Sequence, residues 1–99
     1  MSNNIYNEKG QLSITSLYSL TRTEWKVLIL IAHDLSNGDI VQILSIEIKS
    51  VHNYRTRIGD KLDVKGHSVL GCFARRHCNE LQKLYNDWYG TALTFPKFD

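Results

Sequence analysis

Two consecutive helix starts constrain the fold of this chain more than any other feature. Thr21 and Glu24 form the first, because a hydroxyl residue followed three positions later by a carboxylate is a capping box, which satisfies free amide groups at a helix N-terminus. Ser36 and Asp39 repeat the pattern. We expect the first helix to end near Asp34, since aspartate tolerates the left-handed conformation found after helices. Two helices therefore follow one another closely.

The apolar residues after these starts predict an all-α core. Residues 25–32 are apolar at nearly every position, so the first helix should be central. A short second helix begins at Ser36, and after residues 45–47 a third helix spans about 48–62. Its apolar stripe contains Val51, Ile58 and Leu62, with Arg55 on the inward side and its guanidinium expected near Glu24. No strand pattern of comparable strength occurs.

A fourth, long helix is predicted from about residue 68 to Gly90. Two interpretations of its apolar stripe stay open: internal packing against residues 12–18, or a dimer interface. We favour the dimer, because a lone small domain does not easily bury the aromatic residues near the end of this helix. The predicted interface residues are Phe73, Leu81, Leu84 and Trp88.

Positive charge is concentrated in the middle of the chain. The whole chain has a formal net charge of +2, whereas residues 49–78 hold seven lysines and arginines against two aspartates, which gives 7 − 2 = +5. A basic segment within a nearly neutral chain is typical of a protein that contacts a polyanion. A solvated helix face is the alternative explanation.

Several classes of protein are excluded by composition. No run approaches the roughly 20 apolar residues that span a bilayer, and the first residues lack the order of a secretory signal. We expect a cytoplasmic protein without membrane contact, in which Cys72 and Cys78 are buried free thiols. With His77 they form too few ligands for structural zinc, so we predict no metal and no cofactor. No catalytic constellation occurs, and we predict that the chain is not an enzyme.

Two short helices joined by a tight turn form a helix-turn-helix when the second helix carries hydrogen-bonding side chains outward. In that motif the N-terminal half of the second helix enters the major groove, and flanking cations neutralise phosphates. The predicted base contacts are His52, Asn53 and Thr56. The predicted phosphate contacts on the flanks include Lys49, Arg57 and Lys61.

The order of motifs resembles the LuxR/FixJ-type helix-turn-helix domain. The segment LTRTEWKVL (20–28) is similar to the family's LTxRExEVL, IAHDLSNGDIV (31–41) to IAxGxSNxEIA, and SVHNYRTRIGDKL (50–62) to TVKNHRxxIxxKL. The resemblance covers about residues 20–78. It implies a four-helix DNA-binding domain of the winged-helix-like regulator class, here with an extended C-terminal helix. Its third helix would contact the major groove, and its fourth would help to form a dimer.

The resemblance also assigns roles by position. His52, Asn53 and Thr56 would face bases, Ser50 would hold a phosphate at the start of the third helix, and Lys61 would meet the DNA backbone. The sequence departs from the family at several positions. The most consequential is Glu47, which stands where the family usually has a capping serine, because glutamate is a poorer N-cap and its charge repels phosphate.

We therefore predict an N-terminal arm or linker (1–19), a helix-turn-helix domain (20–78) and a C-terminal helix extension with a tail (79–99). The predicted function is a sequence-specific, DNA-binding transcriptional regulator of the response-regulator kind that binds double-stranded DNA as a homodimer. RNA polymerase and a separate signalling domain are further partners that we consider. The alternative is a protein-interaction module that uses the same fold, which Glu47 and the aromatic C-terminal helix favour.

Overall fold

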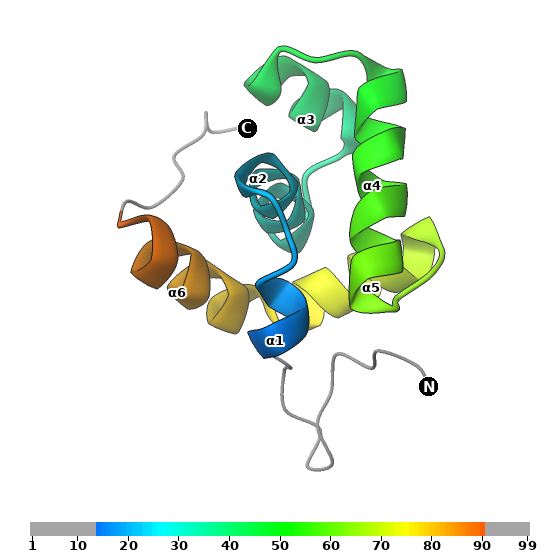
Figure 1. Ribbon diagram of the computed structural model, residues 1–99. Helices are drawn as coiled ribbons and strands as arrows, with labels where there is room; N and C mark the ends of the chain where they lie inside the picture. The colour runs from blue at the N-terminus through cyan, green and yellow to red at the C-terminus, as the bar shows by residue number, and fades with distance from the viewer. Residues whose placement is uncertain (1–13, 91–99) are drawn as a thin grey trace.

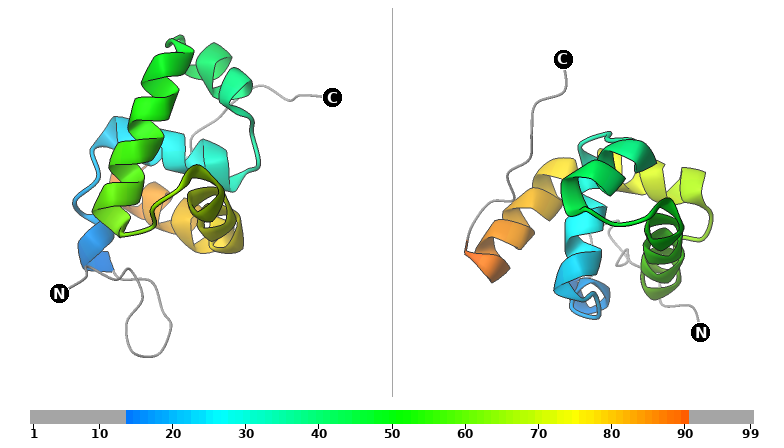
Figure 2. Two further views of the ribbon diagram at one scale, coloured as in Figure 1. Left: turned by 90° about the vertical axis from the view of Figure 1, so that its right-hand side faces the viewer. Right: turned by 90° about the horizontal axis from the view of Figure 1, so that it is seen from above.

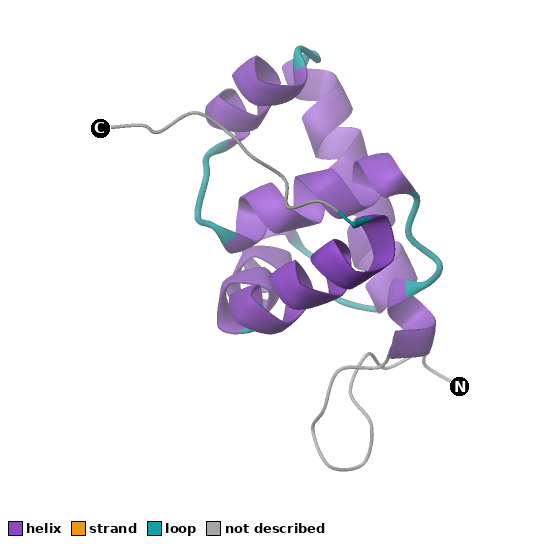
Figure 3. Ribbon diagram, turned by 90° about the vertical axis from the view of Figure 1, so that its left-hand side faces the viewer, coloured by secondary structure: helices purple, strands orange, loops and turns teal. Residues whose placement is uncertain are grey.

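A computed structural model describes residues 14–90 of the 99-residue chain. It contains six helices, α1 (Ile14–Leu17), α2 (Arg22–Ala32), α3 (Asn37–Leu44), α4 (Ile48–Leu62), α5 (His67–Arg76) and α6 (Cys78–Tyr89) (Figure 1). No strand occurs within these residues (Figure 3), so the prediction of an all-α fold is confirmed. Most of the predicted arm and the predicted tail lie outside the described residues.

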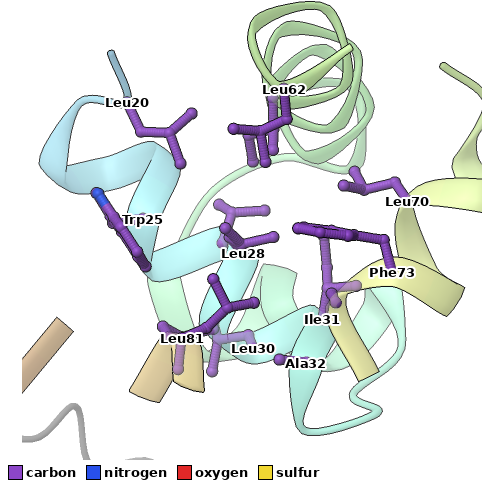
Figure 4. Close-up of a cluster of buried hydrophobic side chains, with 14 of the residues drawn as sticks. Leu20, Trp25, Leu28, Leu30, Ile31, Ala32, Leu62, Leu70, Phe73 and Leu81 are labelled. Carbon is purple, nitrogen blue, oxygen red and sulfur yellow. The ribbon is translucent and has the colours of Figure 1, made fainter. Parts of the chain in front are cut away.

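Helix α2 forms the centre of the domain, as its apolar sequence predicted. It packs against α4, α5 and α6, and Figure 1 shows α4 on one side of it and α6 on the other. Trp25 and all residues from 27 to 32 are buried. In Figure 4, Leu28 and Ile31 of α2 point toward Leu62 of α4 and Phe73 of α5. A helix with apolar residues on most sides needs partners on most sides, and α2 has them.

Both predicted capping boxes are present. The Glu24 amide donates to Thr21 Oγ1 at 3.1 Å, and the Thr21 amide donates to Glu24 Oε1 at 2.8 Å. Ser36 and Asp39 make the same reciprocal pair at 3.1 and 3.0 Å. Asp34 adopts the left-handed conformation after α2, with a φ of 65°. The sequence therefore predicted the start and the end of α2 correctly.

The turn that ends α4 depends on a glycine inside the helix. Asp63 is left-handed (φ 57°), and the Val64 amide donates back to the Gly59 carbonyl at 2.8 Å. This is the hydrogen-bond pattern of a Schellman motif. A Cβ atom at Gly59 would lie 2.7 Å from the Val64 carbonyl oxygen, closer than real Cβ atoms approach. Gly59 thus permits the chain to fold back over the last turn of α4.

The predicted fourth helix is in fact two helices, and the prediction of one long helix is wrong. The chain breaks at His77, where φ is −107° and ψ is 23°, between α5 and α6. The apolar spacing continues across the break, so the sequence pattern did not reveal it. The break lets both helices pack against α2, which places Phe73 and Leu81 in the same core (Figure 4).

The aromatic residues of α6 pack within the chain. Trp88 stacks on Tyr18 at a centroid distance of 4.4 Å and meets the edge of Trp25 at 5.3 Å. The guanidinium of Arg22 lies over the ring of Tyr89, 5.1 Å from its centroid. Tyr18 belongs to the 12–18 segment, so these contacts match the internal-packing alternative for the C-terminal stripe.

The four residues of the predicted dimer interface differ in burial. Phe73 and Leu81 are buried in the core of the single chain, and their dimer role stays a prediction. Leu84 and Trp88 are only partly buried, and for them the dimer role stays a prediction. None of the helices in residues 14–90 combines the length and the apolar character that crossing a membrane requires.

Candidate nucleic-acid interface

Helices α3 and α4 and the turn between them have the geometry of a helix-turn-helix. The turn is 45–47, as predicted, and Ser45 adopts the left-handed conformation with a φ of 55°. The Ile46 amide donates to the Val41 carbonyl at 3.2 Å, which fixes the chain as it leaves α3. Helix α4 packs against α2 and α3 (Figure 2). The two helices of the motif therefore pack against each other, and α4 fixes the pair to α2.

Helix α4 has one buried and one exposed face. Its buried face contains Val51, Ile58 and Leu62, all fully inaccessible to solvent. The three predicted base contacts, His52, Asn53 and Thr56, are all exposed. Because positions i, i+1 and i+4 lie on one side of a helix, the structure brings these three side chains to a single surface. Whether they contact bases stays a prediction.

The predicted phosphate contacts differ in their surroundings. Lys49 and Arg57 are exposed at the flanks of this surface, and Ser50 is partly buried in the first turn of α4. The Arg57 guanidinium lies 5.8 Å from the centroid of the Tyr54 ring, a contact that limits where its charge can go. Lys49, Ser50 and Arg57 therefore border the surface formed by the three predicted base contacts.

Lys61 makes a structural ion pair. Its Nζ donates to Oε1 of Glu24 at 2.7 Å, and Glu24 is only 3% exposed. The pair joins α4 to the capped N-terminus of α2. Burial by itself would raise the pKa of Glu24, but hydrogen bonds from Lys61 and the Thr21 amide outweigh it, so the pKa is lowered. The phosphate contact of Lys61 remains a prediction. Its ammonium group already donates one hydrogen bond, to Glu24.

Arg55 lies on the inward side of α4, as expected, but its guanidinium does not meet Glu24. Nη1 donates to Asn37 Oδ1 at 3.2 Å, and Nη2 donates to the His67 carbonyl at 3.0 Å. The carboxylate of Glu24 pairs with Lys61 instead. The side chain of Arg55 thus links α4 to the start of α3 and the start of α5. Burial, together with the nearby charge of Arg75, lowers the pKa of Arg55.

The N-terminus of α4 lacks a side-chain cap. Glu47 occupies the N-cap position with extended backbone (φ −83°, ψ 156°), and its side chain accepts no hydrogen bond from the first turn. The expectation that glutamate caps poorly here is confirmed. Glu47 is exposed at this end of the helix.

Sequence reasoning missed two residues at this surface. Ile48, the first residue of α4, is 48% exposed although it is large and apolar. The second is His67, the first residue of α5, whose ring centroid lies 5.8 Å from that of His52. Burial, followed by the charges of Arg55 and His52, lowers the pKa of His67. Only the packing of α5 beside α4 reveals this histidine pair.

The cysteines do not extend the site. Cys72 is exposed, so the expectation that both thiols are buried is wrong, and Cys78 is partly buried with a pKa raised by that burial. The sulfur of Cys78 lies 3.8 Å from both ring nitrogens of His33. Among residues 14–90, no three His, Cys, Asp or Glu side chains are grouped in a way that suits a metal ion.

The geometry defines the class of this protein. An all-α domain in which α3 packs against α4, and α4 packs against α2 and α5, has the architecture of a helix-turn-helix DNA-binding domain. The model of the bacterial regulatory proteins of the luxR family matches residues 18–74, more than half of the chain, and the chain belongs to this family. No similar curated protein and no similar solved structure is found.

Family membership confirms the resemblance found in the sequence. The matched residues contain all of α2, α3 and α4, most of α5 and none of α6. The family comprises regulatory proteins, so the chain functions in DNA-binding transcription regulation and not as an enzyme.

Proposed function

We propose that this protein is a sequence-specific transcriptional regulator that inserts α4 into the major groove of double-stranded DNA. The observation that carries the proposal is the two-faced structure of α4. One face is anchored in the core through Val51, Ile58 and Leu62, while the opposite face exposes the polar side chains of His52, Asn53 and Thr56. A helix held in this way presents hydrogen-bonding groups in a fixed geometry, which base recognition requires.

The chemistry of the exposed side chains suits base edges. An asparagine amide can accept from and donate to adenine N6 and N7 together, so Asn53 is the strongest candidate for a specific contact. Thr56 presents a hydroxyl group and a methyl group. Its hydroxyl donates to the His52 carbonyl at 3.1 Å, which orients the methyl group relative to the helix.

The flanking cations suit the DNA backbone. Lys49 and Arg57 are exposed on either side of the base-contact surface and can neutralise phosphates. Ser50 adds a hydroxyl in the first turn of α4. Lys61 contributes less, because Glu24 holds its ammonium. The Glu47 carboxylate opposes phosphate binding from the same end of the helix.

Equilibrium binding to labelled duplexes tests the proposal. We expect affinity to fall steeply with salt, and Asn53→Ala to lose about 1–3 kcal/mol on a selected site, roughly 5- to 150-fold. Asn79→Ala is the matched control, because Asn79 is an exposed asparagine on α6. An Asn53→Ala variant with unchanged affinity and sequence preference would show that the predicted register of α4, with Asn53 facing the bases, is wrong.

A protein-interaction module is the second candidate function, and Glu47 is the observation that favours it. Its carboxylate lies at the end of α4 that DNA would approach. The aromatic C-terminal helix no longer supports this alternative, because Trp88 stacks on Tyr18 within the chain. Absence of binding to random duplex DNA at low salt would favour the alternative, since a DNA regulator retains non-specific affinity.

The dimer that the resemblance implies is proposed to form through the region predicted as the fourth helix, with the partly buried Leu84 and Trp88 of α6 as predicted contacts together with the exposed face of α5. On that face Val69 is 54% exposed, and Cys72 is exposed one turn further along. Mild oxidation should therefore yield a covalent dimer on DNA that Cys72→Ser abolishes and Cys78→Ser retains. Sedimentation showing only monomer at high concentration, with and without DNA, would refute the dimer. Contacts with RNA polymerase or a signalling domain, and the cytoplasmic location, stay predictions.

A further inference from the structure

An exposed apolar side chain lies at the N-terminal end of α4, the end that is proposed to enter the major groove of DNA. Ile48 is the first residue of the helix, and it is 48% exposed. Two other large apolar residues are comparably exposed, but they are accounted for otherwise. Tyr18 stacks on Trp88, and Val69 belongs to the exposed face of α5. Ile48 alone lies on the proposed recognition helix.

Its position makes Ile48 part of the DNA-facing surface. Residues four apart on a helix are neighbours on one side, so Ile48 lies beside His52 and extends the surface of predicted base contacts by one turn. The N-terminal residues of a recognition helix are the ones that meet base edges in a helix-turn-helix complex. Ile48 lies between the exposed residues Glu47 and Lys49. The charge of Lys49 suits phosphate, whereas that of Glu47 opposes it.

In the major groove, the bases offer one principal group for apolar contact. An isoleucine side chain neither donates nor accepts a hydrogen bond, so it gains nothing from amino, carbonyl or ring-nitrogen groups. The C5-methyl group of thymine is the apolar group that a base pair displays there. We propose that Ile48 packs against the C5-methyl group of a thymine and thereby selects a T·A pair next to the base pairs contacted by His52 and Asn53. This inference rests on the proposed function.

The test removes the methyl group from the DNA instead of from the protein. A preferred site is first selected from random duplexes with the unaltered chain. Each thymine of that site is then replaced by deoxyuridine, which lacks the C5-methyl group and keeps every hydrogen-bonding group. We expect one position at which this replacement weakens binding about fourfold, from roughly 0.8 kcal/mol per buried methyl or methylene group.

A variant connects this loss to one side chain. Ile48→Ala should bind the thymine and deoxyuridine duplexes equally at that position. Asn79→Ala is the control, because it shortens an exposed side chain on α6 that belongs to no proposed interface, and it should retain the fourfold difference. Circular dichroism establishes that both variants are folded.

The outcomes separate this inference from the proposed function. If the chain binds no duplex at low salt, both fail. If it binds a preferred site but no deoxyuridine replacement matters, or if Ile48→Ala keeps the full discrimination, the proposed function stands and the thymine contact is refuted.

Discussion

Replacing Gly59 with alanine tests the packing of α4 most directly. Gly59 lies inside α4, where alanine would ordinarily be the better residue by about 1 kcal/mol. The structure predicts the opposite sign. An added Cβ atom would lie 2.7 Å from the Val64 carbonyl oxygen, and this oxygen belongs to backbone that cannot rotate away as a side-chain end would.

The size of the stability loss in Gly59→Ala follows from the contacts that must change to relieve this clash. Relieving the contact displaces Val64, whose amide donates to the Gly59 carbonyl at 2.8 Å and whose side chain is only 7% exposed. The hydrogen bond contributes about 1 kcal/mol net, and burial of a valine about 1.5–3 kcal/mol. Subtracting the gain in helix propensity leaves a loss of about 2 kcal/mol. For a domain of this size, that lowers Tm by roughly 10 °C.

Thermal unfolding followed by circular dichroism measures the effect, and a second glycine supplies the control. At Gly38, in the first turn of α3, an added Cβ atom would lie 3.7 Å from Ser36 Oγ, an ordinary contact. Gly38→Ala should therefore stabilise the chain by about 0.5–1 kcal/mol. A Gly59→Ala variant as stable as the original chain would refute the geometry of this turn.

Three further predictions concern single charged or titratable residues. Glu47→Ser should raise the free energy of unfolding by about 1 kcal/mol, because serine supplies the missing cap, and it should strengthen DNA binding in titrations. Glu47→Gln removes only the charge, so it should strengthen DNA binding without raising Tm. Lys61→Met should destabilise the chain by about 1–3 kcal/mol in urea at pH 7, because Glu24 is left buried without its cation. Because the folded-state pKa of Glu24 is lowered, its stabilising effect is present above its unfolded pKa and is lost as the pH falls through the folded-state value. Lys61→Met should therefore lose less stability on acidification than the original chain does. An unchanged dependence of stability on pH in the acid range would contradict the pairing of Lys61 with Glu24. The pKa of His67 is also lowered, so on acidification this histidine is protonated first in the unfolded chain, and stability should decline as the pH falls below about 6.5. His67→Asn should reduce that decline. Identical pH profiles of stability for the variant and the original chain would refute this role of His67.

The sequence predicted those features that depend on neighbouring residues. Capping boxes act within four residues, so Thr21 and Ser36 were sufficient to place the starts of α2 and α3. The bounds of α4 followed from the turn at 45–47 and from the apolar stripe. The outward orientation of Asn53 followed from the same stripe, because a helix with one buried face leaves the other exposed.

The features that the sequence did not predict depend on residues far apart in the chain. Arg55 and Lys61 lie roughly 1.7 turns apart on α4, and the sequence alone does not show which of the two cations approaches Glu24. The choice is made by Asn37 and the His67 carbonyl, which satisfy Arg55 at the starts of α3 and α5. The break at His77 was missed for a similar reason: the apolar spacing fits both one long helix and two helices that fold onto α2.

The division of α4 into two faces also decides how its substitutions should behave. Val51 and Ile58 are inaccessible to solvent, so changing them alters the fold before it alters DNA binding. Asn53 is exposed, so changing it should alter binding while leaving Tm in place. Lys61 belongs to both groups, because its ammonium holds Glu24 in the structure while the resemblance assigns it to the DNA backbone. A loss of DNA affinity in Lys61 variants is therefore informative only at temperatures where the variant is fully folded, whereas a loss in Asn53 variants reports on recognition directly.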